Sequence, residues 1–245
     1  MSLPPIEALD EIDSTNAEAR RRAEAGETGP VWITAERQTA GRGRRGRNWE
    51  TGKGNLAATL LIVTAKPPVE AAQISFVAAL AVFDLAAAHV PAALISLKWP
   101  NDPLLGGLKT SGILVESGAH TAGGLWLAVG IGVNLATPPV EADRPATAFS
   151  EHMRAPPPKP LEALNTLAAA FERWRGVWES VGFSAIASAW TERAHGLGQP
   201  CTARLANETI EGIAEGLDAE GALRLRTAGG VVRRITAGDV FFGRP

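Results

Sequence analysis

Residues 41–49 read Gly-Arg-Gly-Arg-Arg-Gly-Arg-Asn-Trp, in the first quarter of a 245-residue chain. Helices and strands are both unfavourable for such a run, because glycine loses backbone entropy in either and neighbouring positive charges repel each other. The longer segment 36–56 is therefore expected to form a mobile loop. Its dense positive charge suits the enclosure of an anion, and phosphate is the first candidate because guanidinium groups bind it through paired hydrogen bonds.

The glycine spacing in residues 41–46 literally matches the dinucleotide-binding pattern Gly-x-Gly-x-x-Gly. That pattern needs a helix that opens within the glycines and packs onto a sheet, whereas arginine fills every variable position here. The sequence also lacks the kinase motifs Asp-Phe-Gly and His-Arg-Asp and the Gly-Lys-Ser/Thr of a phosphate-binding loop. Two interpretations stay open for the loop: a lid that encloses phosphates, or a segment that folds on RNA or DNA.

The chain as a whole is not basic. Its net charge is -2, whereas a non-specific nucleic-acid binder is usually basic over a whole face. Cys201 is the single cysteine, which excludes an intramolecular disulfide. The N-terminus lacks the pattern of a signal peptide, the apolar stretch 76–90 is too short to span a bilayer, and the four histidines lack metal-ligand spacing. We therefore expect a cytoplasmic globular protein in which the side chains alone form no metal site.

Hydrophobic periodicity and turn residues predict an α+β fold, a mixed, largely antiparallel sheet with helices on one face. The first helix should be capped by Ser14 or Thr15, with Thr15 and Glu18 forming a capping box, and should stop at Gly26. The other expected elements are strands at 31–36, 55–64, 94–98, 113–117 and 125–135, helices at 69–89, 161–181 and 184–195, a turn at 103–108 and a Pro-rich irregular segment at 136–160.

The sequence pattern changes after residue 195. Short alternating runs, separated by glycines and Asp-x-x-Gly turns, fill the remainder of the chain, and this pattern is typical of a small antiparallel β-barrel. We therefore expect a large domain at 1–195 and a small one at 196–245. The strands of the small domain are expected at 201–205, 209–217, 222–227, 231–235 and 239–242.

Three further motifs carry groups that are suited to chemistry. Residues 98–102, Lys-Trp-Pro-Asn-Asp, combine a cation, an aromatic ring and polar acceptors at a strand end, although they also suit a well-made turn. Lys109 lies near Gly112, where a small residue lets another group approach the backbone, although a strand lysine can simply face solvent. Gly130 and Gly132 lie inside a strand, which a ligand or another backbone on that face would explain.

Taken in order, these motifs resemble the biotin protein ligases, also called biotin–acetyl-CoA-carboxylase ligases. The Arg/Gly loop and Lys-Trp-Pro-Asn-Asp are each rare, and they follow one another in the order that the family has. The resemblance extends from about residue 10 to residue 243. It is carried by Asp13-Ser14-Thr15-Asn16, Gln38, Gly41 to Arg47 with Trp49, Asn55-Leu56, Lys98 to Asp102, Lys109-x-x-Gly112-Ile-Leu-Val-Glu116 and Gly130-x-Gly132-x-Asn134.

The resemblance implies a catalytic domain like those of class II synthetases, followed by an SH3-like barrel. It also implies two reaction steps. The carboxylate of biotin attacks the α-phosphate of ATP to give biotinyl-5′-AMP and pyrophosphate, and a lysine of a biotin carboxyl carrier protein then attacks the mixed anhydride. ATP and biotin are thus the expected substrates, and Mg²⁺ is expected to bridge phosphates.

The resemblance further assigns roles to residues of this chain. Lys109 would lie between the carboxylate and the α-phosphate, where a fixed cation offsets the repulsion between two anions. Arg42, Arg44 and Arg47 would close over the phosphates and exclude water, and Asp102 would orient nearby groups or accept the proton of the carrier lysine. Lys109, Arg44 and Asp102 are therefore the expected catalytic residues. The expected substrate-binding residues are Ser14, Thr15, Asn16, Gln38, Gly41, Arg42, Gly43, Arg44, Arg45, Arg47, Trp49, Lys98, Asn101, Lys109, Gly112, Gly130 and Asn134.

Some members of the family carry an N-terminal winged helix that binds an operator, whereas this sequence starts directly with the catalytic motifs. We therefore expect no DNA or membrane partner, and a homodimer is allowed. The alternative function is that of a lipoate or octanoate ligase or transferase of the same superfamily, and the Arg/Gly loop favours biotin. The segment 136–160 matches the family weakly apart from residues 146–151, so contacts with adenine are not assigned.

Overall fold

The computed structural model describes residues 3–139 and 145–243, so residues 140–144 of the expected irregular segment lie outside the described part. Strand β3 (Leu56–Thr64) is the centre of the main sheet, and it is apolar on both faces, as expected for a strand that is covered on both sides. The pairing of β1 with β2 is parallel and the other pairings are antiparallel, which confirms the expected mixed, largely antiparallel sheet. The strand order is β1 (Ile6–Ile12), β2 (Val31–Gln38), β3, β8 (Leu125–Val133) and β7 (Ser111–Ala119).

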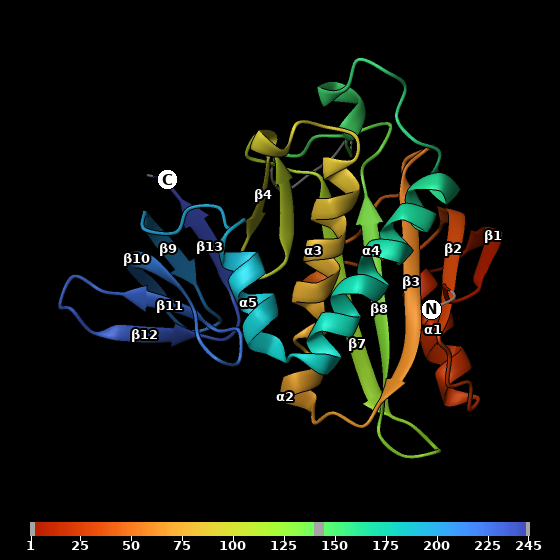
Figure 1. Ribbon diagram of the computed structural model, residues 1–245, viewed down its shortest axis with the longest axis horizontal. Coiled ribbons are helices and arrows are strands. Elements are labelled where there is room, and N and C mark those ends of the chain that lie inside the picture. The colour runs from red at the N-terminus through yellow and green to blue at the C-terminus, as the bar shows by residue number, and fades with distance from the viewer. Residues whose placement is uncertain (1–2, 140–144, 244–245) are drawn as a thin grey trace.

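Helices cover both faces of this sheet, with α3 (Ile74–Ala87) and α4 (Pro160–Ser180) in front of it in Figure 1. On the opposite face, α1 (Thr15–Glu24) packs Ala19 and Ala23 against Ile33 and Leu61. The expectation that helices lie on one face is therefore wrong. The physical reason is that successive side chains of β2 and β3 point to opposite faces, and both sets are apolar.

The start of α1 also differs from the expectation. The helix begins at Thr15, and the N-cap is Ser14, whose Oγ accepts from the Ala17 backbone N at 3.5 Å. Glu18 is then one position too late for a capping box, and it pairs instead with Arg21 and Arg22 on the next turn. The predicted capping box is therefore wrong, whereas the predicted N-cap and helix are confirmed.

The second helical layer is α3 (Ile74–Ala87), preceded by the short α2 (Pro68–Ala71), together with α4 (Pro160–Ser180) and α5 (Phe183–Thr191). Trp32 of β2 meets Phe171 of α4 edge to face, with ring centroids 5.7 Å apart. Residues 68–87 have the length and hydropathy of a membrane span, but 67% of that apolar window is buried inside the protein. These residues form a core helix of this fold.

Three short strands form a separate antiparallel sheet: β4 (Ile95–Lys98), after a 3-10 turn at Ala92–Leu94, then β5 (Asp102–Leu105) and β6 (Leu108–Lys109). The prediction of a plain turn at 103–108 is therefore wrong. The turn itself is limited to Gly106 and Gly107, whose φ angles of 57° and 82° suit a tight hairpin. Propensity missed these strands because each has four residues or fewer.

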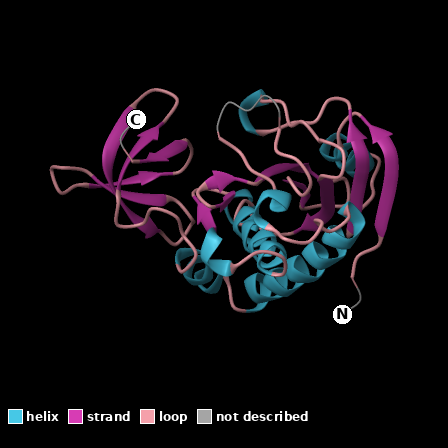
Figure 2. Cartoon of the chain, turned by 90° about the horizontal axis from the view of Figure 1, so that it is seen from above, coloured by secondary structure: helices cyan, strands magenta, loops and turns pink. Residues whose placement is uncertain are grey.

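The C-terminal part is a second five-stranded sheet in which all neighbouring strands are antiparallel. It lies at one end of the molecule, beside the helical layer (Figure 2). Trp99 connects it to the rest by donating Nε1–H to the Gly221 carbonyl at 3.0 Å. The strands lie where they were expected, and the predicted α+β class is confirmed. Their order is β12 (Val232–Ile235), β11 (Leu223–Arg226), β10 (Thr209–Leu217), β9 (Pro200–Arg204) and β13 (Asp239–Phe242).

Candidate active site

A cavity of about 350 Å³ lies beside the N-terminus of α1 and over strands β3, β7 and β8. The cavity is on the sheet face that α1 covers. Gly130 and Gly132 lie two and four residues after Ala128 on β8, so they face the same side as Ala128, which packs under that helix. Small residues leave the space. Ala57, Gly132 and Gly112 form one row across the three strands. The volume suits a small organic ligand.

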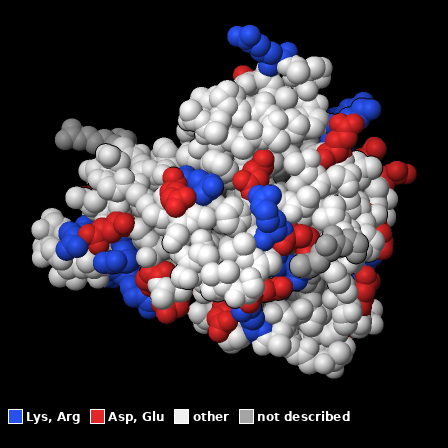
Figure 3. All heavy atoms as spheres, viewed as in Figure 1, with Lys and Arg blue, Asp and Glu red and all other residues white. Residues whose placement is uncertain are grey.

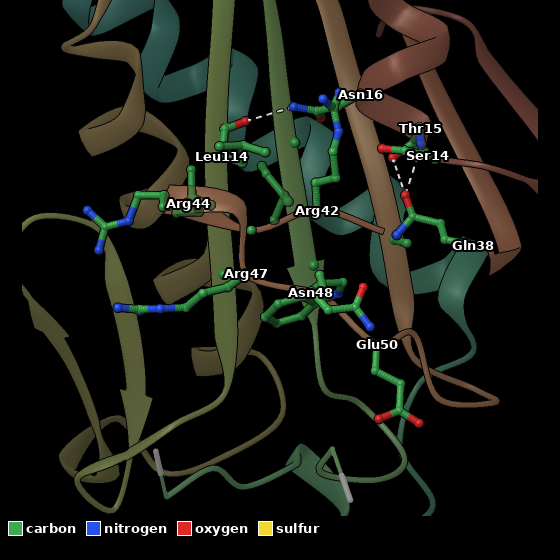
Figure 4. A pocket seen from close by; sticks show the side chains of 18 of the residues that line it. Ser14, Thr15, Asn16, Gln38, Arg42, Arg44, Arg47, Asn48, Glu50 and Leu114 are labelled. Carbon is green, nitrogen blue, oxygen red and sulfur yellow. Dashed lines mark hydrogen bonds between the residues drawn. The ribbon is translucent and has the colours of Figure 1, made fainter. Parts of the chain in front are cut away.

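One end of the cavity is a network of neutral polar side chains (Figure 4). Gln38 Oε1 accepts hydrogen bonds from the Thr15 backbone N at 2.9 Å and from Thr15 Oγ1 at 3.1 Å. Thr59, which is fully buried, donates Oγ1–H to Asn16 Oδ1 at 2.7 Å. Asn16 Nδ2 in turn donates to the Leu114 carbonyl at 3.2 Å and to Glu116 Oε2 at 2.8 Å. Fixed amide and hydroxyl groups of this kind suit a neutral polar ligand group such as a urea or an amide.

The indole of Trp49 lies across the glycines of the sheet. A Cβ atom on Gly132 would lie 2.3 Å from Trp49 Cε2, and one on Gly112 would lie 2.6 Å from Trp49 Cζ3. A Cβ on Gly130 would lie 2.1 Å from Asn16 Oδ1. Side chains of the protein itself therefore take up space over these glycines. The expectation that a ligand or another backbone lies over Gly130 and Gly132 stays a prediction, and both glycines line the cavity.

The other end of the cavity is cationic and is built around a buried carboxylate. The Asp102 side chain is 2% exposed, with Lys109 Nζ 2.6 Å from Oδ1 and Lys98 Nζ 3.5 Å from Oδ2. Burial alone would raise the pKa of Asp102, but the positive charges of Lys109, Lys98 and Arg44 outweigh it and hold the pKa below its ordinary value. Asp102 is therefore charged at neutral pH and holds Lys109 at the cavity wall.

The backbone of residues 41–49 is folded into a compact loop. The Gly43 N–H donates to the Arg47 carbonyl at 2.7 Å, and the Trp49 N–H donates to the Gly41 carbonyl at 2.9 Å. Between them, Arg44–Gly46 form a 3-10 turn in which Arg45 has a φ of 59°. The expectation that residues 36–56 form neither helix nor strand is therefore wrong at two places. Arg44–Gly46 form the 3-10 turn, and β2 continues to Gln38.

The arginines of this loop point in two directions (Figure 4). Arg42 reaches Glu116 of β7, with Nη2 3.1 Å from Oε2. Arg44 and Arg47 extend to the side away from Gln38. Because Arg44 also contributes to the pKa of Asp102, the loop adds its charge to the same end of the cavity as Lys109.

Most residues that the sequence singled out meet at this cavity. Those that line it are Ser14, Thr15, Asn16, Gln38, Arg42, Gly43, Arg44, Arg47, Trp49, Lys109, Gly112, Gly130 and Asn134. Five others lie outside the lining. Gly41 lies under the Trp49 carbonyl, Arg45 pairs with Asp239, Lys98 and Asp102 support Lys109, and Asn101 donates Nδ2–H to the Ile113 carbonyl.

Sequence reasoning missed two kinds of residue. The apolar wall has no chemical signature, because Ala58 and Ile131 read as ordinary strand residues. The supporting carboxylate Asp239 comes from a distant segment and carries no local signal, whereas Glu116 belongs to a motif of the resemblance that was given no role. Thr59 was detectable, since a polar residue inside the apolar run of β3 needs a partner.

Comparisons with known proteins agree with this site. Residues 9–135 match the Biotin/lipoate A/B protein ligase family, and residues 196–243 match the Biotin protein ligase C terminal domain. The chain is 47% identical over 242 residues to a biotin–[acetyl-CoA-carboxylase] ligase of Paracoccus denitrificans, covering 96% of this chain and 99% of that protein. It is 30% identical to the bifunctional ligase/repressor BirA of Escherichia coli over 96% of this chain and 73% of that protein.

Solved structures are similar over nearly the whole length. Biotin protein ligase from Aquifex aeolicus in complex with biotin and ATP superposes with a TM-score of 0.82 at 25% identity, covering 98% of this chain and 99% of that one. The Leishmania major ligase in complex with biotinyl-5-AMP gives 0.64 at 25% identity, covering 96% and 100%. The family expected from the sequence motifs is confirmed, and this chain belongs to the biotin protein ligases.

Proposed function

We propose that this chain activates biotin with ATP and transfers it to a lysine of a biotin carboxyl carrier protein. The observation that carries the proposal is the order of chemistry along the cavity. A neutral polar end at Gln38 and Thr15 is followed by the apolar wall and then by Lys109 and Arg44. Biotinyl-5′-AMP presents a urea ring, an aliphatic chain and an anionic phosphate in the same order.

In the first step, a carboxylate oxygen of biotin forms a bond to the α-phosphorus of ATP, and pyrophosphate leaves. Both reactants are anionic at the point of contact, so a fixed cation is needed there. Lys109 fills this role because Asp102 holds it in place from behind. Asp102 is thereby proposed as a positioning residue for Lys109.

In the second step, the neutral amine of the carrier lysine attacks the acyl carbon of the anhydride, and AMP leaves. The anhydride must survive until the carrier arrives, which requires that water be kept out. The loop at 41–49 provides the cover, with Trp49 packed on Gly132 and Gly112. Arg44 lies at the cavity as a counter-charge for the phosphates, and Arg42, paired with Glu116, ties the loop to β7.

Magnesium is expected to arrive with the nucleotide. Among residues 3–139 and 145–243, no group of three or more His, Cys, Asp or Glu side chains lies together. Mg²⁺ bound to nucleotide phosphates keeps several waters and needs one or two carboxylates at most. Glu50, which lines the cavity, is a carboxylate within this site. The metal would neutralise phosphate charge there.

We further propose that the enzyme is cytoplasmic and is divided into a catalytic domain at 1–195 and a C-terminal domain at 196–245. No DNA or membrane partner is proposed, and a homodimer is compatible with the proposal. The rival nucleic-acid function would require an extended basic surface. On the face seen in Figure 3, basic and acidic side chains lie in mixed groups. The C-terminal match at 196–243 supports the division.

The test is pyrophosphate exchange into ATP with biotin, lipoate and octanoate as separate substrates. Exchange with biotin alone is expected, because an apolar tail would not use the hydrogen-bonding groups of Gln38, Thr15 and Asn16. Exchange with lipoate but not biotin would refute the proposal. Transfer is then measured as label from biotin on a purified carrier domain, with the acceptor lysine changed to arginine as the control.

A further inference from the structure

A carboxylate of the C-terminal sheet holds the Arg/Gly loop. Asp239 begins β13, and its side chain is 9% exposed. Its Oδ2 accepts hydrogen bonds from Arg45 Nη1 at 3.2 Å and from Arg47 Nη2 at 3.0 Å. Arg44 Nη2 lies 4.0 Å from Oδ1. Three successive charges of the loop thus converge on one carboxylate that is 192 or more residues away in the chain.

Asp239 lies on a paired strand, whereas the loop contains only a short 3-10 turn. Asp239 is fixed by the pairing of β13 with β9, where it lies opposite Arg204. The loop is a single 3-10 turn that includes Arg45 with φ 59° and Gly46 with φ 73°. An arginine in the left-handed region is strained, and the ion pairs with Asp239 offset that strain. The loop conformation therefore depends on the C-terminal sheet.

The opposite end of the loop is held by the main sheet. Arg42 pairs with Glu116 at 3.1 Å, and Trp49 packs on Gly112 and Gly132. The loop consequently crosses the cavity between two supports, one on β7 and β8 and one on β13. The second support is partly exposed on the arginine side, where Arg45 and Arg47 are 48% and 38% exposed. Solvent weakens such pairs, and it does so equally at the other support, where Arg42 is 42% exposed. The packing of Trp49 has no counterpart at β13, so the support at β13 is the one that can open.

We infer that Asp239 is a positioning residue for the ligase reaction: it docks residues 41–47 onto the C-terminal sheet, so that this sheet forms part of the lid that retains the adenylate. The inference rests on the proposed function. Asp239 lies outside the residues that line the cavity, and it accepts hydrogen bonds from Arg45 and Arg47 of the loop. Its effect should therefore appear in retention of the intermediate and in loop protection, and much less in the KM for biotin.

The test uses the full chain with Asp239→Asn, and with Glu208→Gln as the matched control. Glu208 lies in the same C-terminal part and loses the same charge, but it pairs with Arg233 at a surface site where it is 46% exposed. Trypsin cleavage after Arg44, Arg45 or Arg47 is followed by mass spectrometry. Release of biotinyl-5′-AMP from the isolated complex is followed in parallel.

In Asp239→Asn, loop cleavage and adenylate release should each rise about tenfold, the effect expected from losing a charge-assisted hydrogen bond. The KM for biotin should stay within about twofold, as for a residue that does not contact the ligand. Asp239→Glu should restore part of the protection. The control should behave as the wild type. A folded Asp239→Asn variant with wild-type cleavage and wild-type adenylate release would overturn the inference.

A second variant approaches the contact from the loop, and its own release rate tests the contact if Asp239→Asn does not fold. Arg45→Ala combined with Arg47→Ala should speed adenylate release, and adding Asp239→Asn should then change release little, because the contact is already lost. Additive effects of the two changes would contradict the proposed contact. If the wild type forms no biotinyl-5′-AMP, the proposed function fails, whereas the cleavage experiment still decides whether Asp239 docks the loop.

Discussion

Two groups of cations border the cavity, and the fold holds them in different ways. Lys109 and Lys98 come from short strands and flank Asp102, whose side chain is 2% exposed. Arg44, Arg45 and Arg47 of the loop instead converge on Asp239 of another sheet, and their side chains are 32%, 48% and 38% exposed, compared with 29% for Lys109 and 16% for Lys98. The lysines pair with a carboxylate of their own short sheet, whereas the loop is docked onto a carboxylate of a distant one.

This difference separates two tasks of the reaction. Lys109 is 29% exposed, but its Nζ lies 2.6 Å from the buried carboxylate of Asp102, and a partly buried pair is screened less by salt than an exposed one. Lys109 is therefore held in position before any substrate arrives. Exposed arginines on a glycine-containing loop can move away and return, as a lid requires. Changes to the lysine group should therefore impair formation of the adenylate, and changes to the loop should chiefly impair its retention.

The largest effect is expected for Lys109→Ala. Removing the cation between two anions should lower the rate of biotinyl-5′-AMP formation by about 100- to 1,000-fold, as for other groups that stabilise developing charge. Single-turnover formation of labelled adenylate measures this rate. A rate within a few-fold of the wild type would remove Lys109 from the reaction.

The matched change within the same ion-pair group is Lys98→Ala. It also takes a cation from Asp102, at 3.5 Å, but Lys98 lies outside the cavity lining. The loss of rate should be clearly smaller, because Lys109 and its contact with Asp102 are kept. Equal losses in the two variants would mean that the charge of the group matters and the position of Lys109 does not.

The next effect concerns the packing of Trp49 against the glycines of the sheet. In Gly132→Ala, the added methyl would lie 2.3 Å from Trp49 Cε2, so the indole must move and the loop must shift with it. We expect adenylate formation to fall about tenfold and release to accelerate, as when a lid loses its packing. Gly176→Ala, where the methyl meets no atom within 4 Å, is the control for an added methyl group. Wild-type kinetics in Gly132→Ala would show that Trp49 is dispensable.

Sequence patterns could predict much of the site, because the chemistry-bearing residues are unusual in themselves. Local sequence alone marks the Arg/Gly loop, the polar cluster at Ser14 to Asn16, and Lys109. Contacts between distant segments could not be predicted in this way. Asp239 meets Arg45 across 194 residues, and a lone aspartate at the start of a surface strand has no pattern to mark it.

The placement of α1 shows the same limit for the fold. Its helical period was readable, but the face of the sheet that it covers depends on the register of β2 and β3, which local propensity does not contain. The cavity lies on that face, so its place in the fold could not be predicted either. The glycines of β8 mark the cavity wall, but the side chains of Trp49 and Asn16 that lie over them could not be read from local sequence.

A smaller effect, confined to retention, is expected for Arg44→Ala. The variant should still form biotinyl-5′-AMP, since Lys109 remains, but should release it about five- to tenfold faster because one counter-charge is gone. Arg37→Ala is the control, since Arg37 is 69% exposed and pairs with Glu11 outside the site. Following the free adenylate by chromatography separates the outcomes. Unchanged release would place the function of the loop elsewhere.

The last prediction concerns stability, and the change is Asp102→Asn. The asparagine keeps the shape but loses the charge that holds Lys109, so unfolding free energy at neutral pH should fall by about 1–3 kcal/mol. The pH dependence follows from the sign of the pKa shift. The pKa of Asp102 is lower in the folded protein than its ordinary value of 3.8, so its stabilisation is fully present above the unfolded value and is lost as the pH falls through the folded one.

The wild type should accordingly lose stability faster than Asp102→Asn below about pH 4, where an unfolded aspartate begins to protonate. Urea denaturation at pH 7, 5, 4 and 3 measures the difference between the two proteins. That difference should be constant down to about pH 5 and should narrow toward pH 3, because protonation removes from the wild type what the substitution has already removed from the variant. A difference that stays constant throughout would mean that the pKa of Asp102 is the same in the folded and the unfolded protein, and Lys109 would then be held by shape and not by charge.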